Sequence, residues 1–374
     1  MDRDDPTIRW LLESRGPSIR YFTLIELLDQ PANLKEVRLT RSKIPEGARF
    51  RALLRGQRLR DDLPQRKRPS DELAELKFSI GGFCVHPYRK WTGAHWRLVS
   101  LVEQGVQPDH PQALAAAQQV LRWLWGKSHR QSIRRIKGLI RRCASQEGNA
   151  LAVYSRLGMI WDERVSGLAA SLVEWQWPDG GWDCDKRPKA HHSSFYESLA
   201  PLWGLVEYYR ATGNVDSLNA AERAAEFFVR HRLFRRESTG EVIDSEWLRL
   251  HYPLYWHYDI LQALRILAML GKLRDQRAQE ALDIVERKRG PDGKWRVEGC
   301  YWMPKGRRGS NEVLDWGRDG PNEMITLNAL RVGCPLCQHA GKPRKLGLTV
   351  STPSEAQDGP LLEFRELYLS MAFP

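Results

Sequence analysis

Two segments of this chain carry the pattern Pro-Asp-Gly-x-Trp, one over residues 178–182 and one over 291–295. Each follows an amphipathic pattern typical of a helix, and each precedes a second helical pattern rich in aromatic residues. Proline ends a helix, Asp-Gly favours a tight turn with positive φ, and the tryptophan can fold back as an apolar anchor. A helix–turn–helix unit that recurs along a chain is the sign of a helical repeat.

The helical patterns come in pairs of unequal character. One member of each pair begins with a group of His, Trp, Tyr, Ser or Asn, and the other begins after Asp or Pro and carries more charge. Buried inner helices surrounded by amphipathic outer helices would show this alternation. We therefore expect an all-α fold, a single α/α toroid of about six hairpins over residues 1–333. The helices expected are 5–12, 19–28, 48–56, 91–104, 111–125, 128–142, 149–157, 162–175, 193–210, 215–231, 255–270, 276–287 and 322–332.

Three other segments are expected to lie outside these helices. Residues 30–45 show no clear period and are expected to form a loop. Residues 57–75 are charged and are expected to form an exposed basic insertion. Residues 334–374 are expected to form a C-terminal tail of low order.

Composition narrows the class of protein. The chain has 374 residues, 42% hydrophobic residues and 15 Trp, enough for a large core and an aromatic-lined cavity. Neither a signal-peptide pattern nor an 18-residue apolar run is seen, so a cytoplasmic protein without a transmembrane segment is expected. The six cysteines should then stay reduced. Cys334 and Cys337 lack a second pair at the spacing of a zinc ribbon.

Basic residues gather at 49–68, 130–142, 230–236 and 305–308, within a net charge of +12. Such patches can meet nucleic acid, acidic lipid or a phosphorylated substrate, or can simply be solvated faces. No nucleic-acid motif with interleaved aromatic residues accompanies them, so a nucleic-acid partner is not expected.

The first turn resembles the repeat of the terpenoid cyclase and protein prenyltransferase superfamily, Gln-x-x-Asp-Gly-Gly-Trp. Gln176, Asp179 and Trp182 match it with both glycines, and 292–295 match its second half. The resemblance implies a squalene-cyclase-like toroid that acts on an isoprenoid or other apolar substrate in an aromatic-lined central cavity, as a cyclase or a prenyltransferase. A non-catalytic toroid that binds a small ligand or peptide is the alternative. The Asp-x-Asp-Asp motif of one cyclase class is incomplete, because Lys186 stands at its last position.

Cysteine, histidine and acidic residues gather directly after the first turn. Cys184, together with His191 or His192 and with Cys143 before another inner helix, would suit zinc. Asp183 or Asp185 would instead act as a Brønsted acid if burial raised its pKa. Capping and packing are the structural alternative. The metal ligands expected are Cys143, Cys184 and His191, and Glu197 is expected to contact substrate.

A second cluster opens the expected helix 255–270. Tyr255 and Trp256 would form an aromatic wall that stabilises a carbocation or holds a cationic group, with His257 and Asp259 as an acid/base pair. Asp259 at a helix N-terminus has a purely structural alternative as a cap.

Polar and aromatic residues also begin two other inner helices. His95 follows Trp91 by one helical turn, so the two share a face, and core packing is the alternative to a ligand role. Asn322 opens the last helix and could serve only as a cap. The residues expected to border one central pocket are His95, His192, Tyr255, His257 and Asn322. The expected substrate contacts are Trp91, His95, Trp96, His192, Glu197, Tyr255, Trp256 and Asn322, and the expected catalytic residues are Asp183, Asp185, His257 and Asp259.

Overall fold

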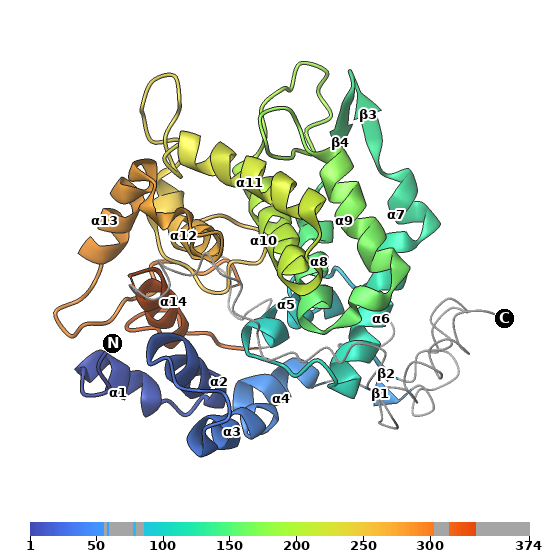
Figure 1. The fold of residues 1–374 in the computed structure, drawn as a ribbon. Coiled ribbons are helices and arrows are strands. Elements are labelled where there is room, and N and C mark those ends of the chain that lie inside the picture. Colours follow the sequence, from blue (N-terminus) through green and yellow to red (C-terminus); the bar gives the residue numbers. More distant parts are fainter. Residues whose placement is uncertain (56–57, 60–77, 80–85, 303–313, 334–374) are drawn as a thin grey trace. The chain divides into compact units, whose positions relative to one another are not determined.

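The computed structural model describes residues 1–55, 58–59, 78–79, 86–302 and 314–333, all within the compact unit Met1–Lys342. This part of the chain is predominantly helical (Figure 1), which confirms the expected class. None of its helices has both the length and the apolar character needed to cross a membrane. The elements are α1 (Pro6–Leu12), α2 (Pro17–Phe22), α3 (Lys35–Ser42), α4 (Ala48–Leu54), β1 (Arg58–Leu59), β2 (Phe78–Ser79), α5 (Ala94–Glu103), α6 (Pro111–Trp125), α7 (Lys127–Gln131), β3 (Arg134–Ile136), β4 (Leu139–Arg141), α8 (Ser145–Arg156), α9 (Glu163–Trp175), α10 (Phe195–Thr212), α11 (Val215–Arg230), α12 (Ile260–Met269), α13 (Gln279–Arg287) and α14 (Glu323–Gly333).

Five helices pack side by side in chain order. Helix α5 packs against α8, α8 against α10, α10 against α12, and α12 against α14. Helices α6, α9, α11 and α13 each pack on one or two members of this row. In α5, nine of ten residues are buried, whereas in α13 only two of nine are buried. The row of five is therefore an inner layer, and the other four helices cover it with one face in water.

The first and last helices of the inner row are also linked. Arg49 of α4 forms an ion pair of 2.9 Å with Glu323 of α14, and α4 packs against α5. The amide of Gln104, just after α5, lies 3.8 Å from the sulfur of Met324. In Figure 1, α14 lies beside α2. Contacts thus lead from α5 along the row to α14 and back to α5.

Helices α8 and α10 approach each other through two glycines. A Cβ on Gly148 would lie 2.3 Å from the backbone nitrogen of Pro201, and one on Gly204 would lie 2.4 Å from the carbonyl oxygen of Gly148. Such distances are far below van der Waals contact, so these positions require glycine. The N-terminal ends of the two helices lie together, since the Ser145 amide donates to Glu197. The helices therefore run parallel at close range.

The first Pro-Asp-Gly-x-Trp turn ties three helices together. The amide of Trp177 donates to the carbonyl of Gly181 at 2.8 Å, and Gly180 has a φ of 100°. The indole of Trp182 donates to the Leu172 carbonyl of α9, and its backbone amide donates to the Ser198 hydroxyl of α10, both at 2.9 Å. Trp182 is 1% exposed. The side-chain amide of Gln176 donates to a carbonyl of α11, that of Ala220, so the glutamine adds a third helix.

The second turn makes the corresponding bonds. The amide of Gly290 donates to the carbonyl of Lys294, as Trp177 does to Gly181. The indole of Trp295 donates to the Val285 carbonyl of α13 at 2.6 Å, ten residues back as in the first turn. Its backbone amide donates to the Thr326 hydroxyl of α14. A tryptophan anchor therefore joins an outer helix to an inner helix at both places.

The helix expected from residue 91 begins at Ala94, so Trp91 lies outside it and does not share a helical face with His95. The structure differs more strongly from the sequence-based expectation in three segments. Residues 128–142 were expected to be helical, but the helix stops at Gln131 and β3 and β4 form a hairpin. Its turn, Lys137-Gly138, has positive φ at both residues, which suits a two-residue hairpin and not a helix. The expected loop over 30–45 contains α3, of which only Val37 is buried. The helix expected from residue 255 begins at Ile260.

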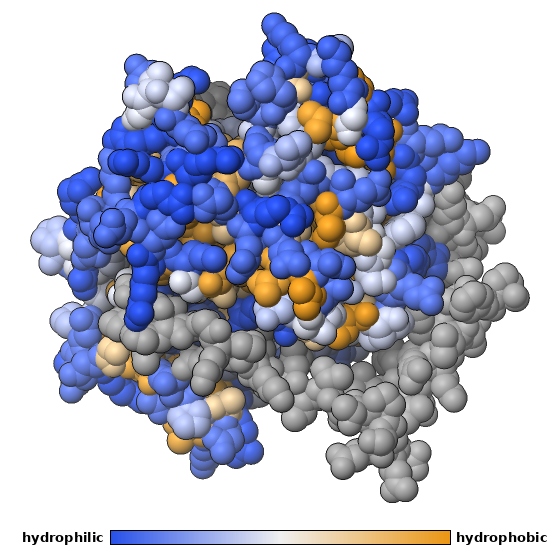
Figure 2. Space-filling view, turned by 45° about the horizontal axis from the view of Figure 1, so that its top comes forward, coloured by the Kyte–Doolittle hydropathy of each residue, from blue (hydrophilic) through white to orange (hydrophobic). Residues whose placement is uncertain are grey.

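The surface of the described residues is mostly hydrophilic on the face drawn in Figure 2, and apolar side chains occur there in small separate groups. Most of the basic insertion expected over 57–75 and all of the expected tail, 334–374, lie outside the described residues.

Candidate functional site

A cavity of about 50 Å³ lies among the inner helices α5, α8, α10 and α12. Its walls come from these helices and from the segment that precedes α12. It is lined by Val99, Glu103, Asn149, Tyr196, Leu199, Ala200, Trp203, Tyr252, Pro253, Leu254, Tyr255, Trp256, His257, Gln262, Arg265 and Ile266.

Stacked aromatic rings form the wall that precedes α12. The ring of Tyr255 stacks on that of Trp91, with centroids 4.2 Å apart. The ring of His257 lies between those of Trp256, at 4.2 Å, and Tyr301, at 3.5 Å. Tyr255 has a φ of 58°, and this left-handed backbone is rare for a residue other than glycine. The fold thus holds an aromatic wall in a conformation that local propensity does not favour.

The lining of the cavity also includes a largely buried ion pair. Arg265 of α12 and Glu103 of α5 lie 2.7 Å apart, and their side chains are 16% and 11% exposed. Asn149 of α8 donates weakly, at 3.5 Å, to the carbonyl of Tyr255. The hydroxyl of Tyr255 has no hydrogen-bond partner among the described residues. The cavity therefore combines apolar rings with a small number of polar groups, as ligand sites usually do.

His257 and Asp259 do not form the expected acid/base pair. Both carboxylate oxygens of Asp259 accept backbone amides, from His251 at 3.1 Å and from Gln262 at 2.9 Å. Asp259 is fully buried, and burial raises its pKa to about 7. Nδ1 of His257 lies 3.0 Å from the carbonyl of Leu254, and burial lowers the pKa of His257 to about 4. Asp259 is thus placed as the cap of α12, while His257 lines the cavity.

The other residues expected near one pocket are spread more widely. His95 is 1% exposed and packs on Tyr88 and Trp96, and burial lowers its pKa to about 3. His192 is exposed. Asn322 accepts the amides of the first residues of α14, as a cap does. Of the five residues expected to border one pocket, Tyr255 and His257 line the cavity.

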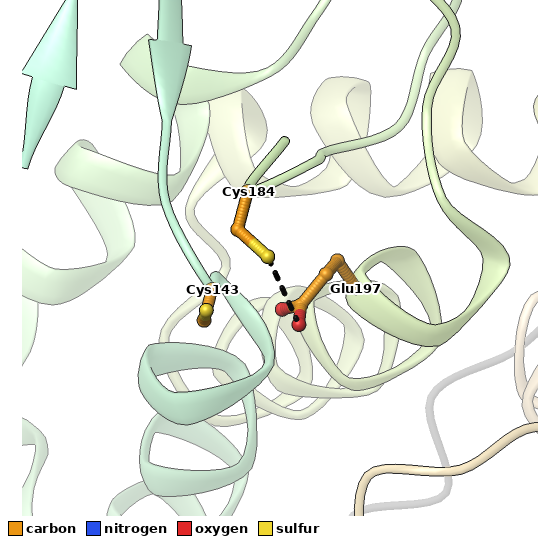
Figure 3. Close-up of side chains that lie close together, drawn as sticks. All are labelled: Cys143, Cys184 and Glu197. Atoms are coloured by element: carbon orange, nitrogen blue, oxygen red, sulfur yellow. Dashed lines mark hydrogen bonds between the residues drawn. The ribbon is translucent and has the colours of Figure 1, made fainter. Parts of the chain in front are cut away.

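A second group of reactive side chains lies where α8 and α10 begin. Cys143 precedes α8, Cys184 follows the first turn, and Glu197 is in the first helical turn of α10. One ligand atom from each lies within 4.8 Å of the others. Figure 3 shows the sulfur of Cys184 directed at the Glu197 carboxylate, 3.9 Å away. His191 lies outside this group, exposed, with Nδ1 2.8 Å from the Lys189 carbonyl.

The protein surroundings of this group affect its three pKa values differently. Glu197 is 9% exposed, and burial raises its pKa. A hydrogen bond between the two cysteines lowers the pKa of Cys143 and raises that of Cys184.

The two aspartates beside Cys184 differ from each other. Burial raises the pKa of Asp183. Asp185 pairs with the exposed Arg187, whose hydrogen bonds lower the pKa of Asp185 to about 2. Asp185 is therefore suited to remain ionised.

Both sites include residues near the N-terminal ends of α8 and α10. Asn149, which lines the cavity, is one helical turn beyond Ser145, whose amide contacts Glu197. Tyr196, next to Glu197, also lines the cavity. The partial positive charges of these two helix N-termini therefore lie close together. The cluster of Cys143, Cys184 and Glu197 and the cavity are thus neighbours along α8 and α10.

Sequence reasoning missed the ion pair Glu103–Arg265 and the cavity contact of Tyr196. A signal for the first was present, because Arg265 is the only charged residue in the apolar helix 260–269. A lone charge in such a helix needs a buried partner. Comparison of the chain with protein-family models, with curated proteins and with solved structures found no match.

Proposed function

We propose that the inner and outer helices form an α/α toroid of the terpenoid cyclase and prenyltransferase kind. Three features support this. The inner helices follow one another in chain order, contacts return from α14 to α5, and the two tryptophan turns join the layers by corresponding hydrogen bonds. The turns then represent two copies of one repeat.

The cavity of this toroid binds a small organic ligand with an apolar or flat surface, and isoprenoids are the class that the motif resemblance implies. The observation that carries this proposal is the cavity itself, which is lined both by aromatic rings and by the ion pair Glu103–Arg265. About 50 Å³ is the room of one or two water molecules, and about a third of the roughly 150 Å³ cavity that admits benzene. An isoprene unit is about as large as benzene, so a prenyl ligand enters only when Trp256 and His257, which line the cavity, move outward.

Acid-catalysed cyclisation is not part of the proposal. Asp183, Asp185 and Asp259 do not line the cavity, and Glu103, which does, is paired with Arg265. Binding of the ligand is the function that the geometry supports best.

Tryptophan fluorescence and calorimetry test this with prenol, geraniol and farnesol, each against a linear alcohol of equal carbon number. We expect the prenyl alcohols to bind more tightly than the linear ones. Trp256→Ala should weaken binding about tenfold, because an aromatic contact of about 1.4 kcal/mol is lost. Leu199→Phe, which fills the cavity, should abolish it. Trp161→Ala is the matched control, since Trp161 is 53% exposed and does not line the cavity.

Two outcomes would reject the proposal. One is that no prenyl alcohol binds to the folded protein. The other is that binding is the same in Leu199→Phe as in the unchanged chain, which would place the ligand elsewhere.

A further inference from the structure

We propose that Cys143, Cys184 and Glu197 form a zinc site with one open coordination position. The ligand atoms come from three different segments and lie within 4.8 Å of one another. In tetrahedral zinc with bonds of about 2.3 Å to sulfur and 2.0–2.2 Å to oxygen, ligand atoms are roughly 3.5–3.8 Å apart. The distance of 3.9 Å from Cys184 Sγ to Glu197 Oε1 already meets this requirement closely. The inference does not depend on what the cavity binds.

Two bonds hold the ligands in place before any metal binds. The backbone amide of Arg142 donates to the carbonyl of Asp183 at 3.1 Å, so the residues next to the two cysteines are joined directly. The amide of Ser145 donates to Oε2 of Glu197 at 3.1 Å, which leaves Oε1 on the side of Cys184. Hydrogen bonds that orient ligands in this way are typical of built metal sites.

The segment that leads to Cys143 is basic. Two thiolates and a carboxylate carry one negative charge more than zinc carries positive charge. Arg141 lies next in the chain to Arg142 and is only 2% exposed, with its guanidinium over the Trp177 ring. Its Nε and Nη1 have no hydrogen-bond partner among the described residues. Arg141 and Arg142 thus place positive charge in the segment directly before Cys143.

The ligand types favour zinc over the hard cations. Calcium and magnesium prefer oxygen ligands, whereas two thiolates with one carboxylate suit zinc. Three protein ligands with a fourth position open are the pattern of catalytic zinc. Cys143 and Cys184 are half-buried, so water or a substrate atom can reach that position. The metal would then polarise or activate whatever group occupies the fourth position, beside the cavity.

The test uses the full chain, purified in the presence of a thiol reductant, freed of metal with a chelator and then titrated with zinc and with cobalt under anaerobic conditions. We expect about one equivalent of zinc to bind. Cobalt should give a visible spectrum of tetrahedral type with a thiolate charge-transfer band in the near ultraviolet. Cys143→Ser and Cys184→Ser should each lose about half of that band. Glu197→Gln should keep the band but bind at least about tenfold more weakly, a loss of about 1.4 kcal/mol.

Two control variants separate this site from other thiols. Cys300→Ser removes another half-buried cysteine of the described residues, and the double variant Cys334→Ser/Cys337→Ser removes the Cys-x-x-Cys pair. Both should bind cobalt as the unchanged chain does. If the thiolate band keeps its full intensity in Cys143→Ser and disappears in Cys334→Ser/Cys337→Ser, the proposal is wrong.

Direct measurements keep the proposal testable if a cysteine variant fails to fold. Absence of a thiolate band in the unchanged, reduced and folded chain would overturn it. So would a full band, with unchanged affinity, in a Glu197→Gln protein whose circular dichroism and melting match those of the unchanged chain.

Discussion

The two tryptophan turns share one frame of corresponding hydrogen bonds, but they differ in the side chains that stand at two positions beside it. In each, the indole donates to an outer helix and the backbone amide donates to a hydroxyl of an inner helix, Ser198 or Thr326. Two residues after the tryptophan stands Cys184 in the first turn and Val297 in the second. One residue before the hydroxyl stands Glu197 in the first and Ile325 in the second.

The comparison separates scaffold from chemistry. Val297 and Ile325 are buried and apolar, so the same frame serves packing alone in the second turn. In the first turn the corresponding positions bear a thiol and a carboxylate directed toward each other. The tryptophan motif alone therefore indicates architecture, and the residues at these two positions decide whether a reactive site is built on it.

The largest effect is expected from removing the anchors. Trp182→Ala and Trp295→Ala should each destabilise the protein by about 3–5 kcal/mol, because both rings are 1% exposed and each truncation leaves a cavity. Urea unfolding followed by circular dichroism measures this. A loss below about 1 kcal/mol for either variant would break the equivalence of the two turns.

The hydroxyls that receive the tryptophan amides should matter next. Ser198→Ala and Thr326→Val each leave a buried amide without its acceptor, which costs about 1–3 kcal/mol. The same unfolding experiment applies, with Ser166→Ala as control, since the Ser166 hydroxyl bonds only within an exposed stretch of α9. Equal losses of stability at Ser198 and Thr326 would support the equivalence of the two turns. A loss at only one would show that the bond from amide to hydroxyl matters in that turn alone.

The smallest effect should distinguish the two aspartates. Asp179 accepts the amide and the hydroxyl of Ser193 at 2.7 and 2.5 Å, so Asp179→Asn should cost about 1–2 kcal/mol. Asp292 makes a surface ion pair with Arg296, and Asp292→Asn should leave the urea midpoint unchanged. Equal sensitivity at both positions would contradict the view that the first turn is more tightly fixed than the second.

Local chemistry explains which parts of the fold the sequence could predict. Proline and Asp-Gly fix the turns through backbone bonds that span few residues, and the hydrophobic periods located the longer helices. Helix α3 was missed because its single buried residue, Val37, leaves no periodic signal. The hairpin of β3 and β4 was missed because its basic residues imitate a solvated helical face, although Lys137-Gly138 indicated a turn.

The candidate sites were predictable only in part, for a similar reason. Cys143 and Cys184 were expected to act together, and the structure places them side by side. The third member was expected to be His191, but the loop that carries it leads away from the thiols, and α10 brings Glu197 to them instead. The lone charge of Arg265 in its helix indicated that a partner exists, but no local pattern identifies that partner as Glu103, on a helix distant in the sequence.

The glycine contact between α8 and α10 sets the distance between the two helices, and so the distance between Cys143 and Glu197 at their N-terminal ends. Gly148 lies one turn beyond the start of α8, and Pro201 one turn beyond Glu197. A methyl group at position 148 would have to push the two helices apart, since its nearest neighbour would be 2.3 Å away. Mutations at this helix contact would therefore change the distances between the proposed zinc ligands, and with them the preferred ionic radius, without replacing any ligand.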